Sequence, residues 1–185
     1  MNMTDNDALS IPASEDWTDI RDAVGKLCDD FPNEYRNTLD KVDQYPTEFV
    51  KTMTESAFLG ALIPEEYGGS GLPLSAAVAV LETIPERGCN AAACHAQMYT
   101  MGTVLKYGSP EQKQTYLPAI ASGELRLQAI GVTEPTTGSD TTQLKTRAER
   151  TESCTYIVNG QKVWTSRAFE SDLMLLLART TPAAE

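Results

Sequence analysis

Two short segments late in the chain have the pattern of strand ends that run into polar loops, Ala129–Asp140 (AIGVTEPTTGSD) and Val163–Ser166 (VWTS). In the first, Pro135 fixes the backbone and Gly138 permits a tight turn, so hydroxyls and free amides lie together. The hydroxyls are those of Thr133, Thr136, Thr137 and Ser139. Such a cluster suits a phosphate or the polar edge of a heteroaromatic ring. Taken alone, threonine-rich turns usually satisfy their own backbones, and a hairpin tryptophan such as Trp164 usually serves packing.

Other candidate sites are weaker. The four cysteines, Cys28, Cys89, Cys94 and Cys154, contain no CxxC pair, and the one histidine, His95, does not complete a zinc set. We therefore expect no metal site, and reduced structural thiols. We interpret His95 as a satisfied interior or interface residue. The glycine-rich segment Glu65–Leu72 lacks both phosphate-loop patterns, so a plain turn is the better interpretation.

Helices occupy the chain before these segments. Trp17, Ile20, Val24, Leu27 and Phe31 recur with helical spacing, and Pro32 should end that helix. Residues 33–45 are either a loop or a poor helix. Further helices are expected from Pro46 to Gly60, over Leu74–Glu86, from the N-cap Asn90 to Gly108, and from Ser109 to Gly123. Ser109, Pro110 and Gln112 form the clearest start signal, a capping box with proline at the first position.

The apolar period changes from 3.6 to 2 after Gly123, which indicates strands. Strands are expected at 125–132 and 143–149, at 156–158 and 161–164 as a hairpin across Asn159-Gly160, and at 173–178 as a strand covered on both faces. The fold class is therefore multidomain α and β. We expect a flexible tail at 1–14, an all-α domain at 15–123, and an incomplete antiparallel β-barrel or sandwich domain at 124–185.

Composition narrows the classes of function. The net charge of −11 argues against general nucleic-acid binding, which needs lysine and arginine to displace counterions. No apolar run of membrane-spanning length occurs, and the acidic N-terminus does not look like a signal or transit peptide. The expected location is therefore cytoplasmic.

The combination of motifs resembles the acyl-CoA dehydrogenase family along nearly the whole chain. The matching stretches are IPEEYGGSG (63–71), YGSPEQK (107–113), VTEPTTGSD (132–140), LKTRA (144–148), VNGQKVWTS (158–166) and LLLAR (175–179). TEPxxGSD followed about two dozen residues later by NGxKxW is the specific pairing. The resemblance implies an N-terminal α domain and part of the middle β domain, FAD as cofactor, and an acyl-CoA thioester as substrate.

It also implies roles for individual residues. Ile130, Gly131, Val132 and Thr133 would lie along the flavin, with the Thr133 hydroxyl at the isoalloxazine edge. Ser139 would contact the FAD pyrophosphate region and lie close to the bound CoA thioester, and Gly138 would also belong to the cofactor site. Trp164 would stack beside the isoalloxazine, with Thr165 next to it. Ser166 would sit near flavin N5 and O4, where the family commonly has threonine.

Two departures from the family stand out. Arg167 occupies a position where many members have a small residue, so its cation either approaches the flavin region or turns to solvent. The family's reaction needs a carboxylate base for α-proton abstraction, with β-hydride transfer to flavin N5. That base lies in a C-terminal helical bundle for which these 185 residues have no match, so no catalytic residue is assigned.

Three hypotheses remain open at this point. The first is the N-terminal part of an FAD-dependent acyl-CoA dehydrogenase, inactive by itself. The second is a short subunit of a hetero-oligomer whose partner supplies the base, and the third is a non-catalytic binding module. For the complete enzyme, the resemblance implies an electron-transferring flavoprotein as acceptor and a homo-oligomer or hetero-oligomer as assembly.

Overall fold

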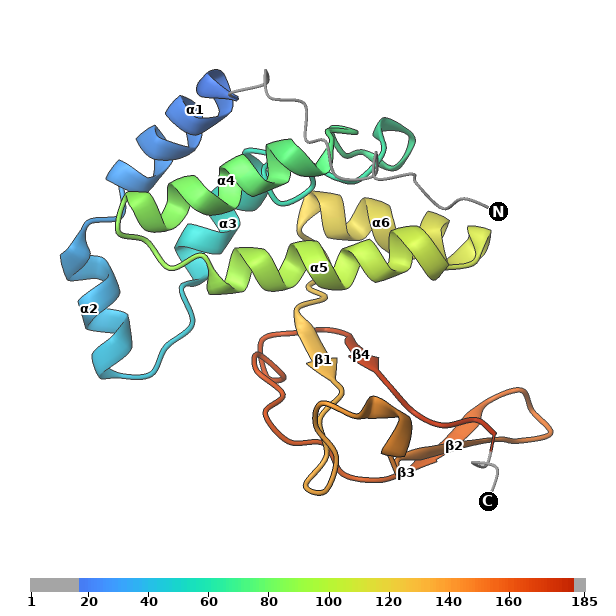
Figure 1. Ribbon diagram of the computed structural model, residues 1–185. Coiled ribbons are helices and arrows are strands. Elements are labelled where there is room, and N and C mark those ends of the chain that lie inside the picture. The colour runs from blue at the N-terminus through green and yellow to red at the C-terminus, as the bar shows by residue number, and fades with distance from the viewer. Residues whose placement is uncertain (1–16, 182–185) are drawn as a thin grey trace, which may run out of the picture.

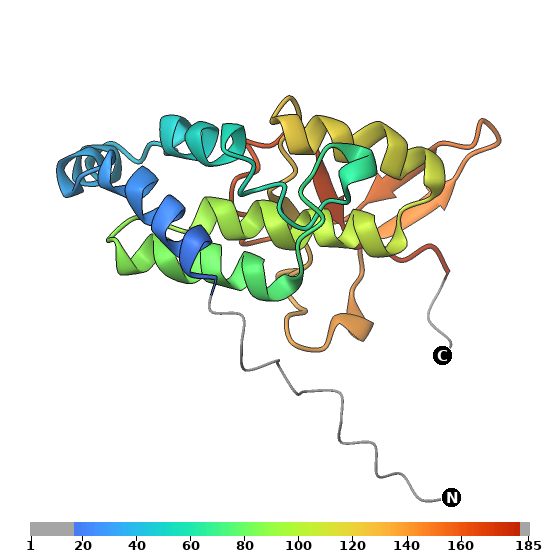
Figure 2. The same cartoon turned by 90° about the horizontal axis from the view of Figure 1, so that it is seen from above.

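Six α-helices make up the first part of the structure, a computed structural model that describes residues 17–181. The helices are α1 (Thr18–Asp29), α2 (Asn33–Lys41), α3 (Thr47–Glu55), α4 (Leu74–Glu86), α5 (Ala92–Tyr107) and α6 (Pro110–Ser122). The long helix α5 lies centrally and contacts α3, α4 and α6, as Figure 1 and the view from above in Figure 2 show. The tail expected at 1–14 lies outside the described residues.

The hydrophobic core belongs mainly to these helices and has two parts. One lies between α1, α3, α4 and α5 and includes Val24, Met53, Val80, Ile84 and Cys94. The other lies between α5, α6 and the segment that enters the β region, and consists of Ile63, Met101, Val104, Leu117, Ile120 and Leu127. Because Leu127 belongs to this second cluster, the start of the β region is fixed to the helices by apolar packing.

The clearest helix signal in the sequence is confirmed. The Gln112 amide donates to the Ser109 hydroxyl at 3.2 Å, and the Ser109 amide donates to Gln112 Oε1 at 2.9 Å. Gly123 ends α6 at a φ of 81°, a conformation that glycine adopts without a side-chain clash. The turn that leads from the helices into the β region is thus determined locally.

Helix α4 has the predicted bounds, Leu74–Glu86, whereas other helices differ from expectation at their ends. Residues 33–41 form the helix α2, so the helical alternative for 33–45 is the correct one there. Helix α3 ends at Glu55 and not at Gly60. Asn90 precedes α5 by two residues, and its side chain accepts the Ala92 amide at 2.8 Å. The loop after α3 contains the short 3₁₀ helix η2 (Glu65–Tyr67) within the glycine-rich segment.

The β region consists of two separate pairs of short strands below α5 (Figure 1). Strand β1 (Ala129–Gly131) pairs in parallel with β4 (Met174–Leu176), with Ile130 opposite Leu175. Strand β2 (Arg147–Arg150) pairs antiparallel with β3 (Tyr156–Asn159). The 3₁₀ helix η3 (Thr141–Gln143) lies between β1 and β2. A helical part followed by a β region confirms the outline of the expected fold class, but residues 17–181 contain no antiparallel barrel or sandwich.

The hairpin expected across Asn159-Gly160 is wrong. Strand β3 pairs with β2 through the turn at 151–155, and residues 161–164 form no strand. The expected turn type needs positive φ at both central residues, and neither Asn159 nor Gly160 has one. A side chain at Gly160 would lie 2.7 Å from the Cα of Thr146, so the glycine serves close backbone approach.

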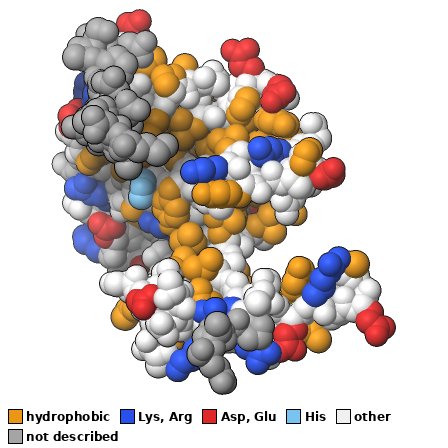
Figure 3. All heavy atoms as spheres, turned by 45° about the vertical axis from the view of Figure 1, so that its right-hand side comes forward, with side chains coloured by type: hydrophobic (Ala, Val, Ile, Leu, Met, Phe, Trp, Pro, Cys, Tyr) orange, Lys and Arg blue, Asp and Glu red, His pale blue; other side chains and the backbone are white. Residues whose placement is uncertain are grey.

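The prediction that 173–178 is covered on both faces is also wrong for the described part of the chain. Leu173, Met174, Leu176 and Leu177 are all exposed, because β4 has a single neighbouring strand. Figure 3 shows hydrophobic side chains on the surface where the helical part adjoins the β region.

Candidate functional site

The two polar segments at the centre of the sequence analysis lie side by side. The Val163 amide donates to the Thr133 carbonyl at 2.9 Å, one residue before Trp164. The Lys162 ammonium donates to the Val132 carbonyl at 3.0 Å. Residues 132–134 and 162–163 therefore form one continuous corner, which we call the motif corner.

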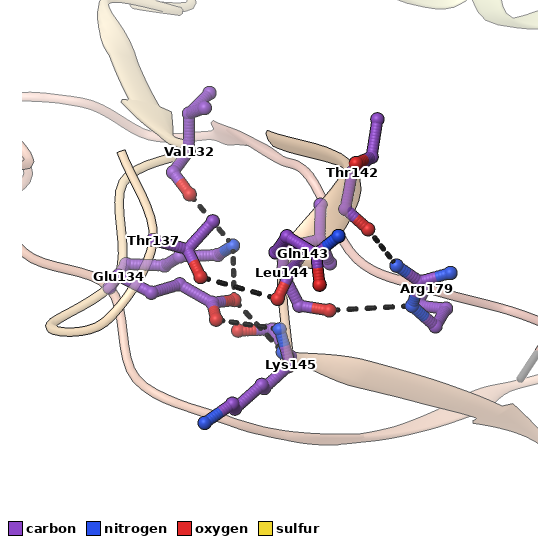
Figure 4. Close-up of polar contacts among 10 residues, drawn as sticks. Val132, Glu134, Thr137, Thr142, Gln143, Leu144, Lys145 and Arg179 are labelled. Atoms are coloured by element: carbon purple, nitrogen blue, oxygen red, sulfur yellow. Dashed lines mark hydrogen bonds and ion pairs between the residues drawn. The ribbon is translucent and has the colours of Figure 1, made fainter. Parts of the chain in front are cut away.

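A buried ion pair fixes the motif corner from inside. Lys162 Nζ lies 2.9 Å from Glu134 Oε1, and the two side chains are only 8% and 4% exposed. The Glu134 carboxylate also accepts the Lys145 amide at 2.6 Å and the Thr146 amide at 2.9 Å (Figure 4). The carboxylate thereby joins the end of β1, the entry to β2 and the segment before Trp164.

These donors define the charge state of Glu134. Hydrogen bonding by Thr146, by the Lys145 amide and by Lys162 holds the pKa of the Glu134 carboxyl well below its usual range. A carboxylate that keeps its charge and has its oxygens occupied by protein donors is a poor proton acceptor. Glu134 is therefore a structural anion at this corner and does not serve as a general base.

The turn after Glu134 leaves backbone donors open. The Glu134 and Thr137 amides pair with each other's carbonyls at 2.8 and 3.1 Å, and the Thr137 hydroxyl donates to the Gln143 carbonyl at 3.2 Å (Figure 4). Within residues 17–181, the amides of Thr136, Gly138 and Ser139 have no protein acceptor. The turn thus uses one threonine hydroxyl internally and leaves these three backbone amides without an acceptor among residues 17–181.

Trp164 stands out of the protein surface. Its side chain is 88% exposed and its φ is 60°. Positive φ is uncommon for a bulky residue, and such conformations concentrate at functional sites. The Trp164 carbonyl accepts the Ser166 amide at 3.0 Å, which closes a tight turn directly behind the indole. The exposed indole can stack against another aromatic ring.

The predicted site residues are distributed around this corner. Gly131 is buried in β1, where a side chain would lie 3.2 Å from both Leu176 and Lys162 atoms. Ile130, Val132, Thr133 and Thr165 are half-buried, whereas Gly138, Ser139, Trp164 and Ser166 are exposed. The hydroxyls of Thr133, Ser139 and Ser166 form no hydrogen bond with the described residues. Hydrogen bonds from Lys162 and Val163 to the carbonyls of Val132 and Thr133 join the 132–134 and 162–163 segments.

Arg167 ends the same turn in a left-handed conformation, with φ of 59°. It is half-buried. The choice between a guanidinium near the flavin region and one turned to solvent therefore stays a prediction.

The sequence does not predict the Glu134–Lys162 ion pair. The available signal was two charged residues of opposite sign within otherwise uncharged motif segments, TEP and QKVW. His95 was expected to lie in the interior or at an interface, and the first of these is wrong. His95 is exposed on α5, with its ring 4.9 Å from that of Tyr99. The described chain holds no cluster of three or more metal-ligating side chains, and none of its helices is long and apolar enough to cross a membrane.

Comparison with known proteins gives a consistent family. The family model described as "Acyl-CoA dehydrogenase, N-terminal domain" matches residues 14–124, and "Acyl-CoA dehydrogenase, middle domain" matches residues 129–185. A glutaryl-CoA dehydrogenase of Desulfococcus multivorans is 36% identical over 172 residues, which are 90% of this chain and 42% of the relative. The chain thus spans less than half the length of this curated relative.

Solved structures agree with the sequence matches. An acyl-CoA dehydrogenase from Geobacillus kaustophilus superposes with a TM-score of 0.81 and 31% identity, covering 89% of this chain and 43% of that one. A chain of the ChsE4-ChsE5 complex from Mycobacterium tuberculosis gives a TM-score of 0.74 and 32% identity, covering 89% and 41%.

Proposed function

The chain belongs to the acyl-CoA dehydrogenase family, and from this premise we propose that it forms the helical part and one wall of the flavin site in an FAD-dependent acyl-CoA dehydrogenase. The complete enzyme would carry out α,β-dehydrogenation of an acyl-CoA thioester. The motif corner is the observation that carries the proposal, because it joins the two family motifs through a buried ion pair.

The groups at the motif corner and in the two turns that follow its segments, 135–139 and 164–166, fit a flavin dinucleotide. A flavin presents an aromatic ring system with polar edges and a pyrophosphate, which require a stacking surface and hydrogen-bond donors. The exposed Trp164 indole supplies the surface, and the open amides of Gly138 and Ser139 supply donors for the pyrophosphate. We propose that Ile130–Thr133 and Thr165–Ser166 line the isoalloxazine, with the Thr133 and Ser166 hydroxyls at its polar edge.

The roles of this chain in the reaction are binding and orientation. When bound, FAD supplies the acceptor for the β-hydride of the acyl group. Ser139 would contact both the pyrophosphate and the CoA thioester, because it is exposed and its hydroxyl has no partner among residues 17–181. The Glu134–Lys162 pair would act as a positioning element, since it fixes the backbone on both sides of the flavin-facing residues.

The base that removes the α-proton would come from polypeptide outside these 185 residues. Glu134 is unsuited to that role because its carboxylate is occupied by Lys145, Thr146 and Lys162. An electron-transferring flavoprotein is the proposed electron acceptor, and a homo-oligomer or hetero-oligomer the proposed assembly.

A second candidate function is a subunit whose partner chain supplies the base. The exposed apolar side chains along β4 favour it, because such a patch is typical of a surface that another polypeptide covers. The ChsE4-ChsE5 structure, to one chain of which this chain is similar, is a complex of two differently named proteins. The non-catalytic binding module predicts instead that the 185-residue chain is monodisperse and retains no flavin.

The test is purification of the 185-residue chain in the presence of FAD, followed by addition of an acyl-CoA. We expect weak retention of flavin and no acyl-CoA-dependent bleaching of its absorbance. Trp164→Ala should weaken retention further, whereas Tyr156→Ala, an exposed aromatic residue on β3, should not. Robust turnover by this chain alone would refute the assignment of the base to other polypeptide. If the unchanged chain and Trp164→Ala retained equal amounts of flavin, the proposal that this chain forms one wall of the flavin site would be refuted.

A further inference from the structure

Three of the four cysteines gather in one part of the helical core. Cys28, in the last turn of α1, and Cys94, in the first turn of α5, belong to the first core cluster. Cys89 packs against that cluster from the loop between α4 and α5. The fourth, Cys154, is exposed on the turn between β2 and β3, and all four are free thiols. The proposed flavin site uses none of them.

The Cys28 and Cys89 thiols lie in contact. The Cys89 amide donates to the Ile84 carbonyl at 3.0 Å, which fixes Cys89 to the end of α4. Its Sγ lies 3.7 Å from the carbonyl oxygens of Cys28 and Phe31, at the end of α1. The two thiols also form a hydrogen bond with each other. Two cysteines that are 61 residues apart in sequence are thus neighbours in space.

An ion pair keeps the elements that carry these thiols together. The end of α1 lies beside the turn that leads from α4 into α5 (Figure 1). There Arg87 Nη1 lies 3.1 and 3.2 Å from the two carboxylate oxygens of Asp29. The same guanidinium lies against Gly25 of α1, where a side chain would be only 2.7 Å from it. The thiols are therefore held near each other, which favours a reaction within the chain over one between chains.

Reagents in solvent can reach one of the three clustered thiols. Cys89 is half-buried and lines a cavity of about 60 Å³ at α2 and α3, together with Tyr35, Arg36 and other residues. Cys28 and Cys94 are 2% and 0% exposed. A small thiol reagent therefore meets Cys89 first, and Cys28 lies directly behind it.

The electrostatic environment gives the two thiols different roles. Burial is the main reason that the pKa of Cys28 is raised, to about 12, and burial also raises the pKa of Cys89. The hydrogen bond between the thiols adds to the rise at Cys28 but lowers the pKa of Cys89, and the Arg36 guanidinium lowers the pKa of Cys89 as well. Cys89 is thus the thiol that ionises first, and the thiolate is the nucleophile in disulfide exchange.

We propose that Cys89 and Cys28 form a disulfide bond when the protein meets a low-molecular-weight disulfide. The Cys89 thiolate attacks one sulfur of the reagent, which forms a mixed disulfide and releases the first reagent thiol. Cys28 then gives up its proton and attacks Cys89 Sγ, which closes the Cys28–Cys89 bond and releases the second reagent thiol. Two protein thiols are oxidised and one reagent disulfide is reduced. The bond would join the end of α1 to the entry of α5, and the inference does not rest on the proposed flavin site.

The test is incubation of the folded 185-residue chain with oxidised glutathione. Remaining thiols are then blocked with N-ethylmaleimide in urea, and unreduced peptides are identified by tandem mass spectrometry, whose fragments separate Cys89 from Cys94. We expect one internal disulfide, between Cys28 and Cys89. Cys28→Ser should stop at a lasting mixed disulfide on Cys89. Cys89→Ser should slow the modification of Cys28 by about tenfold or more, because the accessible thiol is gone.

Cys154→Ser is the matched control, because Cys154 is an exposed cysteine outside the cluster. It should form the Cys28–Cys89 bond at the rate of the unchanged chain. If Cys28→Ser fails to fold, Cys89→Ser decides together with the peptides of the unchanged chain, since Cys89 is half-buried. The proposal would be overturned by a bond to Cys94 instead, by a Cys28–Cys89 bond that forms only in urea, or by glutathione on Cys154 with Cys28 and Cys89 still reduced.

Discussion

Replacing Lys162 with methionine tests whether the buried ion pair holds the motif corner together. Methionine keeps most of the length and apolar stem of lysine but removes the ammonium. The change deletes the hydrogen bonds to the Val132 carbonyl and to Glu134. It also leaves the Glu134 carboxylate buried with the Lys145 and Thr146 amides as its remaining donors.

The expected loss of unfolding free energy is a large fraction of the stability of an ordinary domain. Removing one member of a buried ion pair destabilises a protein by about 3–5 kcal/mol, because an uncompensated charge stays buried. Lys162 is 8% exposed, so solvent screening reduces this only slightly. Each kcal/mol corresponds to a shift of roughly 2–4 °C in Tm for a chain of this size. A fall of about 6 °C or more is therefore expected.

The assay is urea unfolding of Lys162→Met, followed by circular dichroism and tryptophan fluorescence. Lys145→Met is the matched control, since the Lys145 side chain is exposed and only its backbone amide contacts Glu134 (Figure 4). The control should stay within about 0.5 kcal/mol of the unchanged chain. A Lys162→Met chain as stable as the control would refute the argument that this pair organises the motif corner.

Three further perturbations follow from the same structure. The pKa of Glu134 is lowered in the folded chain. Its stabilising effect should therefore be complete above about pH 4.3 and decline at lower pH. Glu134→Gln should flatten the acid side of a plot of unfolding free energy against pH, and an unchanged slope would contradict this. Gly160→Ala places a methyl group 2.7 Å from the Thr146 Cα. The free energy of unfolding, measured by thermal unfolding, should therefore fall by about 1–3 kcal/mol. A neutral effect would show that Gly160 and Thr146 are not closely packed. Burial raises the pKa of the Cys28 thiol to about 12, so iodoacetamide at pH 8 should label the exposed Cys154 and leave Cys28 unmodified until urea is added, as peptide mass spectrometry would reveal.

The helical part of the fold was predictable because its signals are local. A capping box at Ser109 and a glycine at the end of α6 act within one turn of backbone, and both occur as expected. Apolar residues spaced at 3 and 4 positions placed α1 and α4 for the same reason. Helix α2 remained ambiguous because none of its residues is fully buried, so apolar spacing could not reveal it.

The β region was harder to predict because pairing depends on contacts distant in sequence. Asn159-Gly160 has the composition of a hairpin turn, but Gly160 instead permits close approach to Thr146. Lys162 turns inward to Glu134, 28 residues earlier, and no local pattern reports such a pair. The apolar run at 173–178 was expected to be covered on both faces, but β4 pairs with β1 alone and most of its apolar side chains are exposed among the described residues.

The candidate site was recognisable from motif order and spacing, whereas the Glu134–Lys162 ion pair that holds it together was not. TEPTTGSD and VWTS could be assigned to one corner by family resemblance, and the Val163–Thr133 hydrogen bond joins them in the structure. Trp164 is exposed and has a positive φ, and neither property could be predicted from the sequence.

The motif corner is proposed to be one wall of a flavin site. Titration of the ¹⁵N-labelled 185-residue chain with FAD, mapped by backbone amide and indole shifts, tests it most directly. The largest shifts should fall on residues 130–139 and 164–167, including the Trp164 indole N–H, with the Trp17 indole unchanged. Shifts confined to other residues, or none at saturating FAD, would contradict the claim.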